Sequence, residues 1–167
     1  MLLPAMLVFL KTQMGQCADV GVVDSTALAV CHNRRIHSHK VFKDIAKRGK
    51  TSTGWFYGFK LHAVFNRLGE LVTFRLTAGN TDDRQALKQM AKQLSGTLVG
   101  DKGYISKDLA DWLKKEYGIT LLTGVKKGMK APKPTPEQKR LLKQRGVVET
   151  IFDQLKNLCQ IEHSRHR

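Results

Sequence analysis

Cysteine is scarce in this chain of 167 residues. Its three cysteines, Cys17, Cys31 and Cys159, are scattered and form no Cys-x-x-Cys pair. Disulfide frameworks and zinc ribbons both need cysteines at close, regular spacing, so the sequence argues against both classes. Unpaired thiols fit a reducing compartment, and we therefore expect a cytoplasmic protein.

Long apolar runs are lacking as well. The apolar stretch at residues 1–10 is about half as long as a helix must be to cross a bilayer. It has no basic segment before the apolar part and no small-residue cleavage site after it, so it does not match a secretion signal. We expect no membrane association, and we interpret residues 1–19 as the remnant of an upstream region.

Acidic residues are in short supply. The chain has 14 Asp and Glu against 29 Lys and Arg, which gives a formal net charge of +15. A basic soluble domain of this kind usually binds a polyanion, and nucleic acid is the expected partner. The apolar fraction of 41% is ordinary, so a chain of this length can bury a core and form one domain.

Two short apolar runs each end on an aspartate. Residues 20–24 read Val-Gly-Val-Val-Asp, and residues 97–101 read Thr-Leu-Val-Gly-Asp. Each pattern predicts a buried strand that places a carboxylate at its end, where open α/β sheets carry their chemistry. Gly100 and Gly103 leave room for a backbone, a metal or a phosphate to approach Asp101. For either aspartate alone, a turn or capping role is the simpler interpretation.

A third carboxylate is predicted on the last helix. Arg145, Glu149 and Lys156 are spaced at i, i+4 and i+11, which places them on one helical face. The apolar stripe lies elsewhere on the helix and consists of Val148, Ile151, Leu155 and Leu158. A solvated face with an Arg145–Glu149 salt bridge is the alternative interpretation, and Asp153 is an alternative acidic residue.

Between the two aspartates, the pattern predicts a β-hairpin and a helix. Residues 55–80 alternate in polarity on both sides of a glycine-containing turn at residues 66–69. Thr81 is the expected N-cap of the helix, and Asp82 and Asp83 are expected to serve as capping residues rather than catalysts. The elements expected after the second aspartate are a helix over 106–117, a strand over 119–122 and a helix from residue 135 or 136.

Residues 31–53 are basic, contain one acid, Asp44, and lack apolar periodicity. We expect a mostly irregular loop that contacts phosphate groups. The histidines of this segment have no cysteine or carboxylate at ligand spacing, which argues against a metal site there. The basic residues of this segment expected to bind DNA are Arg34, Arg35, Lys47, Arg48 and Lys50.

Three carboxylates in this order, on a basic chain, suit a pair of divalent metal ions that cut a phosphodiester. With these motifs the chain resembles the catalytic domain of bacterial insertion-sequence transposases of the DDE type, similar to the IS982 and IS4-like groups. The matching motifs are Val-Asp-Ser-Thr at 23–26, Gly-Phe-Lys-Leu-His at 58–62, Thr-Ala-Gly-Asn at 77–80, Gly-Asp-Lys-Gly-Tyr at 100–104, and Arg145 with Glu149 and Lys156.

The resemblance implies an α/β, RNase H-like fold over residues 20–167, with a mixed five-stranded sheet (a hairpin plus parallel strands) flanked by helices. It also implies that Asp24, Asp101 and Glu149 form a metal-binding catalytic triad for two Mg²⁺ ions, for which Mn²⁺ can substitute. Arg145 and Lys156 would contact DNA near the transposon end. The other lysines expected to bind DNA are Lys60, Lys102, Lys126 and Lys127.

By the same resemblance, the domain would hydrolyse a DNA strand and join the freed 3′-OH to target DNA. Its partners would be double-stranded DNA, at transposon ends and target, and a second copy in a synaptic complex. Leu142 stands where the related signature has a tyrosine, and little sequence precedes Asp24, so we interpret the chain as a truncated reading frame. The alternatives are a non-catalytic DNA-binding remnant and an RNase H-like nuclease without strand transfer.

Overall fold

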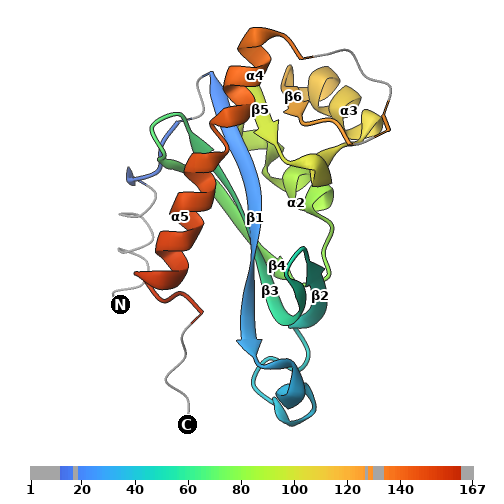
Figure 1. Cartoon of the computed structure of the whole chain (residues 1–167), viewed down its shortest axis with the longest axis vertical. Helices are drawn as coiled ribbons and strands as arrows, with labels where there is room; N and C mark the ends of the chain where they lie inside the picture. The colour runs from blue at the N-terminus through green and yellow to red at the C-terminus, as the bar shows by residue number, and fades with distance from the viewer. Residues whose placement is uncertain (1–11, 17–18, 127, 130–133, 163–167) are drawn as a thin grey trace.

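A mixed β-sheet forms the centre of the molecule (Figure 1). The computed structural model describes residues 12–16, 19–126, 128–129 and 134–162. Within these residues the sheet has six strands in the order β2-β3-β1-β5-β6, with β4 paired to β3. The strands are β1 (Val20–Cys31), β2 (Lys47–Thr51), β3 (Gly54–Asn66), β4 (Leu71–Ala78), β5 (Thr97–Gly100) and β6 (Thr120–Thr123).

The helices begin and end where capping chemistry allows. Ser106 accepts from the backbone N–H of Leu109 at the start of one helix, and Gly118, at φ 67°, ends it in the left-handed conformation. Thr135 and Gln138 form a capping box before Pro136. The α-helices are α2 (Asp83–Met90), α3 (Lys107–Tyr117), α4 (Pro136–Lys143) and α5 (Gly146–Asn157), and the 3-10 helices are η1 (Asn33–Ser38), η2 (Ala91–Gln93) and η3 (Lys102–Tyr104).

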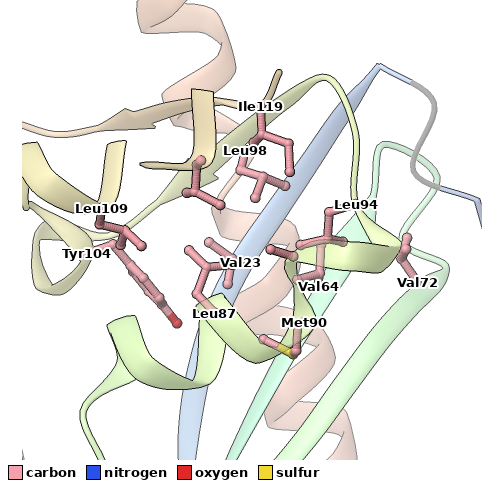
Figure 2. Packing of buried hydrophobic residues seen from close by; sticks show 12 residues of the cluster. Val23, Val64, Val72, Leu87, Met90, Leu94, Leu98, Tyr104, Leu109 and Ile119 are labelled. Atoms are coloured by element: carbon pink, nitrogen blue, oxygen red, sulfur yellow. The ribbon is translucent and has the colours of Figure 1, made fainter. Parts of the chain in front are cut away.

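Helices cover both faces of the sheet, because alternate residues of the buried strands are apolar in both directions. Val23 packs on one side with residues of α2 and α3, in the cluster that Figure 2 shows. Val22 packs on the other side with Val148 and Phe152 of α5. The predicted α/β class with flanking helices is confirmed, and the arrangement is consistent with an RNase H-like fold.

The sheet differs from the prediction in having a sixth strand. Strand β2 lies within the segment predicted to be irregular and pairs with β3, from Lys47 opposite Gly58 to Thr51 opposite Gly54. Gly49 is required at its centre, since a Cβ there would lie 2.1 Å from the carbonyl oxygen of Gly79. Backbone pairing and this close approach form the strand, and neither produces an apolar period in the sequence.

Two local predictions were wrong by a few residues. Strand β1 does not end at Asp24 but continues to Cys31, because its second half pairs with β3. The N-cap of α2 is Asp82, which accepts from the backbone N–H of Arg84, rather than Thr81.

No helix in the described part of the chain is long and apolar enough to span a membrane. The apolar stretch at residues 1–10 lies outside the described residues.

Candidate active site

Asp24 and Asp101 lie on neighbouring parallel strands. The register pairs Val23 of β1 with Gly100 of β5, and each aspartate is the next residue along its strand. Strand β5 ends at Gly100, whereas β1 continues, so Asp24 is held within the sheet opposite Ala63 of β3. Asp24 lies two residues after Val22, and side chains two apart on a strand share a face. Asp24 therefore lies on the sheet face that α5 covers. The predicted convergence of these two carboxylates is therefore met by the strand order.

The turn after β5 fixes the Asp101 carboxylate. Asp101 is the N-cap of η3, and its Oδ1 accepts from the backbone N–H of Gly103 at 2.7 Å. A Cβ on Gly103 would lie 2.9 Å from the same oxygen, so only glycine allows this approach without a shift. The glycine that follows the aspartate thus serves to orient its carboxylate.

Asp24 is a buried carboxylate. Burial is the main cause that raises its pKa to about 6, and the Asp101 and Asp83 carboxylates raise it further. The backbone N–H of Ser25, which donates to Asp24 Oδ1 at 2.8 Å, and the Arg145 guanidinium act in the opposite direction. Since the net effect is a raised pKa, the described surroundings disfavour the charged form of Asp24, chiefly by removing it from water.

Replacing Asp24 with asparagine is expected to stabilise the metal-free protein above pH 6. The folded-state pKa of Asp24 lies above the ordinary value of 3.8, so its protonated form favours folding and this contribution is lost as the pH rises through about 6. At pH 7 the Asp24→Asn variant should gain about 1–3 kcal/mol in free energy of unfolding. Urea denaturation in EDTA at pH 4 and pH 7 measures this, and an equal effect at both pH values would contradict it.

Helix α5 brings Arg145 to the site. Val148 and Phe152 anchor the helix against the sheet, and α5 contacts β1. Arg145, at the start of the helix, is close enough to lower the pKa of Asp24, and its buried Nε has no hydrogen-bond partner among the described residues. A guanidinium beside the Asp24 carboxylate is suited to hold a phosphate oxygen that approaches the site.

Glu149 is the predicted carboxylate that the structure leaves apart. It is exposed on α5, next to the buried Val148. Among the described residues, no three His, Cys, Asp or Glu side chains are grouped closely enough to hold a metal ion. Lys156, near the other end of α5, pairs with Glu162 at 3.5 Å between Nζ and Oε1. The structure therefore brings together Asp24, Asp101 and Arg145 of the predicted set.

Asp83 is part of a polar group next to the site, a role that sequence reasoning missed. Its Oδ1 accepts from Ser25 Oγ at 2.9 Å and from Lys60 Nζ at 3.1 Å, and it lies 3.3 Å from His62 Nδ1. Ser25 alternates with Asp24, so this group lies on the sheet face opposite Asp24, under α2. Asp83 begins α2 as expected, but its carboxylate also joins that helix to β1 and β3.

The signal that could have revealed Asp83 lies in β3. Lys60 and His62 occupy one face of a strand whose neighbours are apolar, and a buried ammonium needs a carboxylate partner. His62 is fully buried and its Nε2 lies 2.9 Å from Thr77 Oγ1. Burial is the main cause that lowers the pKa of His62 to about 4, so its ring is neutral near pH 7.

Tyr104 completes the buried polar region. It follows Asp101 in η3 and is only 1% exposed. Burial, followed by the charges of Asp83 and Asp24, raises the pKa of its hydroxyl well above the ordinary value. The hydroxyl has no hydrogen-bond partner within the described part of the chain. The aromatic ring meanwhile packs in the core beneath Gly100.

The basic residues predicted to bind DNA fall in several places. Arg34 and Arg35 are exposed on η1, while Lys47, Arg48 and Lys50 are exposed on β2. Lys102, on η3 beside Asp101, and Lys126 are also exposed. The Lys60 side chain, also predicted to bind DNA, is only 13% exposed, and its ammonium binds Asp83. Lys127 lies outside the described residues.

The fold and these motifs agree with a comparison to protein families. A family model described as "Transposase DDE domain" matches residues 14–167, which include both aspartate-bearing strands and α5. A search of curated proteins and a search of solved structures found no match to the chain. Domains of this family act on DNA in transposition and recombination, and they generally use divalent metal ions. The chain belongs to the family of transposase DDE domains.

Proposed function

We propose that the chain is the catalytic domain of a DNA transposase that cleaves DNA at transposon ends and transfers the freed 3′-OH to target DNA. The observation that carries this proposal is that Asp24 and Asp101 directly follow Val23 and Gly100, which are paired in the parallel strands β1 and β5. The formal charge of +15 supports it, because a polyanionic substrate must otherwise approach an acidic site. The same motifs favour the IS982 or IS4-like groups.

The side chains at this site fit a divalent cation. Carboxylate oxygens are the donors that Mg²⁺ prefers, and Asp24 is a buried carboxylate near enough to the Asp101 carboxylate for that charge to raise its pKa. We propose that Asp24, Asp101 and Glu149 hold two Mg²⁺ ions, with Mn²⁺ able to substitute. When bound, such a pair would supply a charge that activates the attacking water or 3′-OH and stabilises the leaving oxygen.

The case for Glu149 as the third ligand is its relation to Arg145. Residues four apart on a helix share a face, and Arg145 is near enough to Asp24 to affect its pKa. Glu149 therefore lies on the same side of α5 as Arg145, the side that is nearer to Asp24 and Asp101. Asp153 lies one further turn along the helix and is not four residues from Arg145. Its carboxylate accepts a hydrogen bond from Asn157 Nδ2 at 2.6 Å.

The protein's own cations would position the substrate. Arg145 would bind a phosphate oxygen next to Asp24, since its guanidinium is near enough to that carboxylate to lower its pKa. Lys102 follows Asp101 directly and would hold the adjacent phosphate. Lys126, Lys127 and Lys156 would contact phosphates further along the duplex, and two copies of the domain would hold two transposon ends in a synaptic complex.

A second candidate function is a DNA-binding remnant without catalysis. The observation that favours it is the exposure of Glu149, together with the lack of a three-acid group among the described residues. On this alternative the basic surface binds duplex DNA, but the metal site does not form. A nuclease without strand transfer is a third alternative, which joined products would separate from a transposase.

Titration calorimetry with Mg²⁺ and Mn²⁺ tests the proposal. We expect the wild type to bind metal, and we expect Asp24→Ala and Glu149→Ala each to abolish that binding. Asp153→Ala is the matched control, because it removes an acid from the same helix and should leave metal binding unchanged. The titration is repeated with duplex DNA present, and a folded wild type that binds no metal in either case would support the remnant.

A further inference from the structure

Trp55 is an exposed tryptophan near the turn of the β2–β3 hairpin. It retains 52% of its accessible surface, and the register places it opposite Lys50, with Arg48 on the same face of the hairpin. The Arg48 Cζ lies 5.1 Å and the Lys50 Nζ 5.6 Å from the centroid of its indole ring. Both distances are within the range of cation–π attraction.

Folding of the hairpin does not account for this tryptophan. The next residue on its face, Tyr57, is 7% exposed, packs edge-on against His39 and lies 3.5 Å from the carbonyl oxygens of Phe42 and Lys43. Trp55 has no comparable burial. A large aromatic side chain left in solvent beside cations is typical of a binding surface rather than of a core.

The positive charges at this hairpin are not paired with carboxylates among the described residues. The ring that holds Arg48 and Lys50 is neutral, and no carboxylate in the described part of the chain forms an ion pair with either. Asp44 is the only acid in the sequence between Asp24 and Glu70. The surface thus combines an exposed aromatic ring with uncompensated positive charge, which is the chemistry that binds nucleic acid.

The neighbouring basic helix is tied to the same hairpin. The Asn33 side chain donates from Nδ2 to the backbone carbonyl of Trp55 at 2.7 Å. Asn33 begins η1, which carries the exposed Arg34 and Arg35. The hairpin and η1 lie together at one end of the molecule (Figure 1). We define this region, Arg34, Arg35, Arg48, Lys50 and Trp55, as the hairpin tip.

The hairpin tip is too distant to act on the phosphate that Asp24 would bind. Trp55 lies eight positions before Ala63 in β3, and Ala63 is paired with Asp24. An extended strand rises about 3.4 Å per residue, so the separation along β3 is at most roughly 27 Å. Figure 1 shows the tip at one end of the long strands and β5, which leads to Asp101, toward the other. This upper limit corresponds to about eight base pairs of duplex.

We propose that the hairpin tip is a second DNA-contacting surface, which holds duplex several base pairs, and at most about eight, from the cleavage position. Arg48, Lys50 and the η1 arginines bind backbone phosphates, and the Trp55 ring lies against the DNA between them. The inference rests on the proposed function, because it takes duplex DNA as the partner. An acidic protein is the competing partner, and the experiment separates the two.

Trp55 fluorescence gives a direct measurement. The chain has two tryptophans, so a Trp112→Phe variant leaves Trp55 as the only reporter. Titration with a 30-base-pair duplex at low salt should quench its emission, and the quenching should reverse as salt is added. DNA binding seen by anisotropy without any change in Trp55 emission would overturn the inference. Poly-glutamate that displaces the duplex and quenches Trp55 equally would also overturn it.

A pair of matched double variants tests the charges. Arg48→Gln with Lys50→Gln removes two cations from the tip, and Lys107→Gln with Lys115→Gln removes two exposed cations from α3. The slope of log K against log salt should fall by about 1.8 for the tip variant and change little for the α3 variant. Equal changes in the slopes of both variants would overturn the proposal for the hairpin tip and leave the proposed function standing. A wild type that binds no duplex would overturn the proposed function.

Discussion

Replacing Asp101 with asparagine should abolish metal-dependent DNA cleavage and leave salt-sensitive DNA binding intact. Asparagine keeps the shape of the side chain and can still accept from the Gly103 N–H, so η3 should form as in the wild type. The substitution removes the negative charge that a divalent cation requires. Loss of a residue that hydrogen-bonds to a metal ligand lowers metal affinity or activity about 10–100-fold. Loss of a ligand itself should therefore lower the cleavage rate more than about 100-fold.

The measurement is nicking of supercoiled plasmid DNA in Mg²⁺ or Mn²⁺, with duplex affinity determined in parallel. Asp111→Asn is the control, because Asp111 is an exposed aspartate on α3 and its loss changes the net charge by the same amount. Cleavage by Asp101→Asn at the wild-type rate would show that the carboxylate pair is not the catalytic centre. Loss of both cleavage and DNA binding would indicate a folding defect, which circular dichroism detects.

The fold was largely predictable because local patterns agree with the tertiary arrangement. The period-two segments around residues 66–69 form the β3–β4 hairpin, and the apolar runs before Asp24 and Asp101 form adjacent parallel strands. Strand β2 was not predictable from periodicity, since its side chains are mostly basic and its formation depends on pairing with β3. The pairing depends on the tertiary structure, so it cannot be inferred from the residues of the segment 47–51 alone.

The candidate site was predictable only where it depends on strand ends. Asp24 and Asp101 follow from strand order, but the reach of Glu149 depends on side-chain placement on α5, so its role stays a prediction. Asp83 was assigned to capping because its place in the first turn of α2 satisfies the local rule. Its bonds to Ser25 and Lys60 span 58 and 23 residues, and only the assembled sheet brings these groups together.

The buried group around Asp83 makes Asp83→Ala the substitution with the largest expected effect on stability. Lys60 is 13% exposed at its side chain, and removal of Asp83 leaves its ammonium without its carboxylate partner. Ser25 Oγ loses its acceptor in the same step. Breaking one partner of a fully buried ion pair costs about 3–5 kcal/mol, and because the Asp83 side chain is 25% exposed we expect a smaller loss of about 2–3 kcal/mol in the free energy of unfolding.

Urea denaturation of three variants separates this explanation from a simple loss of helix capping. Asp82→Ala removes the actual N-cap of α2 and should cost only about 1 kcal/mol. The double variant Asp83→Ala with Lys60→Met removes both charges, and it should recover much of the loss because an apolar pair tolerates burial. If the double variant is no more stable than Asp83→Ala, the ion pair is not the source of the effect.

A second measurement links the two faces of the sheet. The Asp83 charge helps to raise the pKa of Asp24, so Asp83→Asn should bring that pKa below its value of about 6. Nuclear magnetic resonance titration of the Asp24 carboxyl carbon reports this directly. Because the Asp83 charge acts on Asp24 electrostatically, a carboxylate on the α2 face then adjusts the proton affinity of the site on the α5 face. An unchanged Asp24 titration in a folded Asp83→Asn protein would show that the two faces are electrostatically independent.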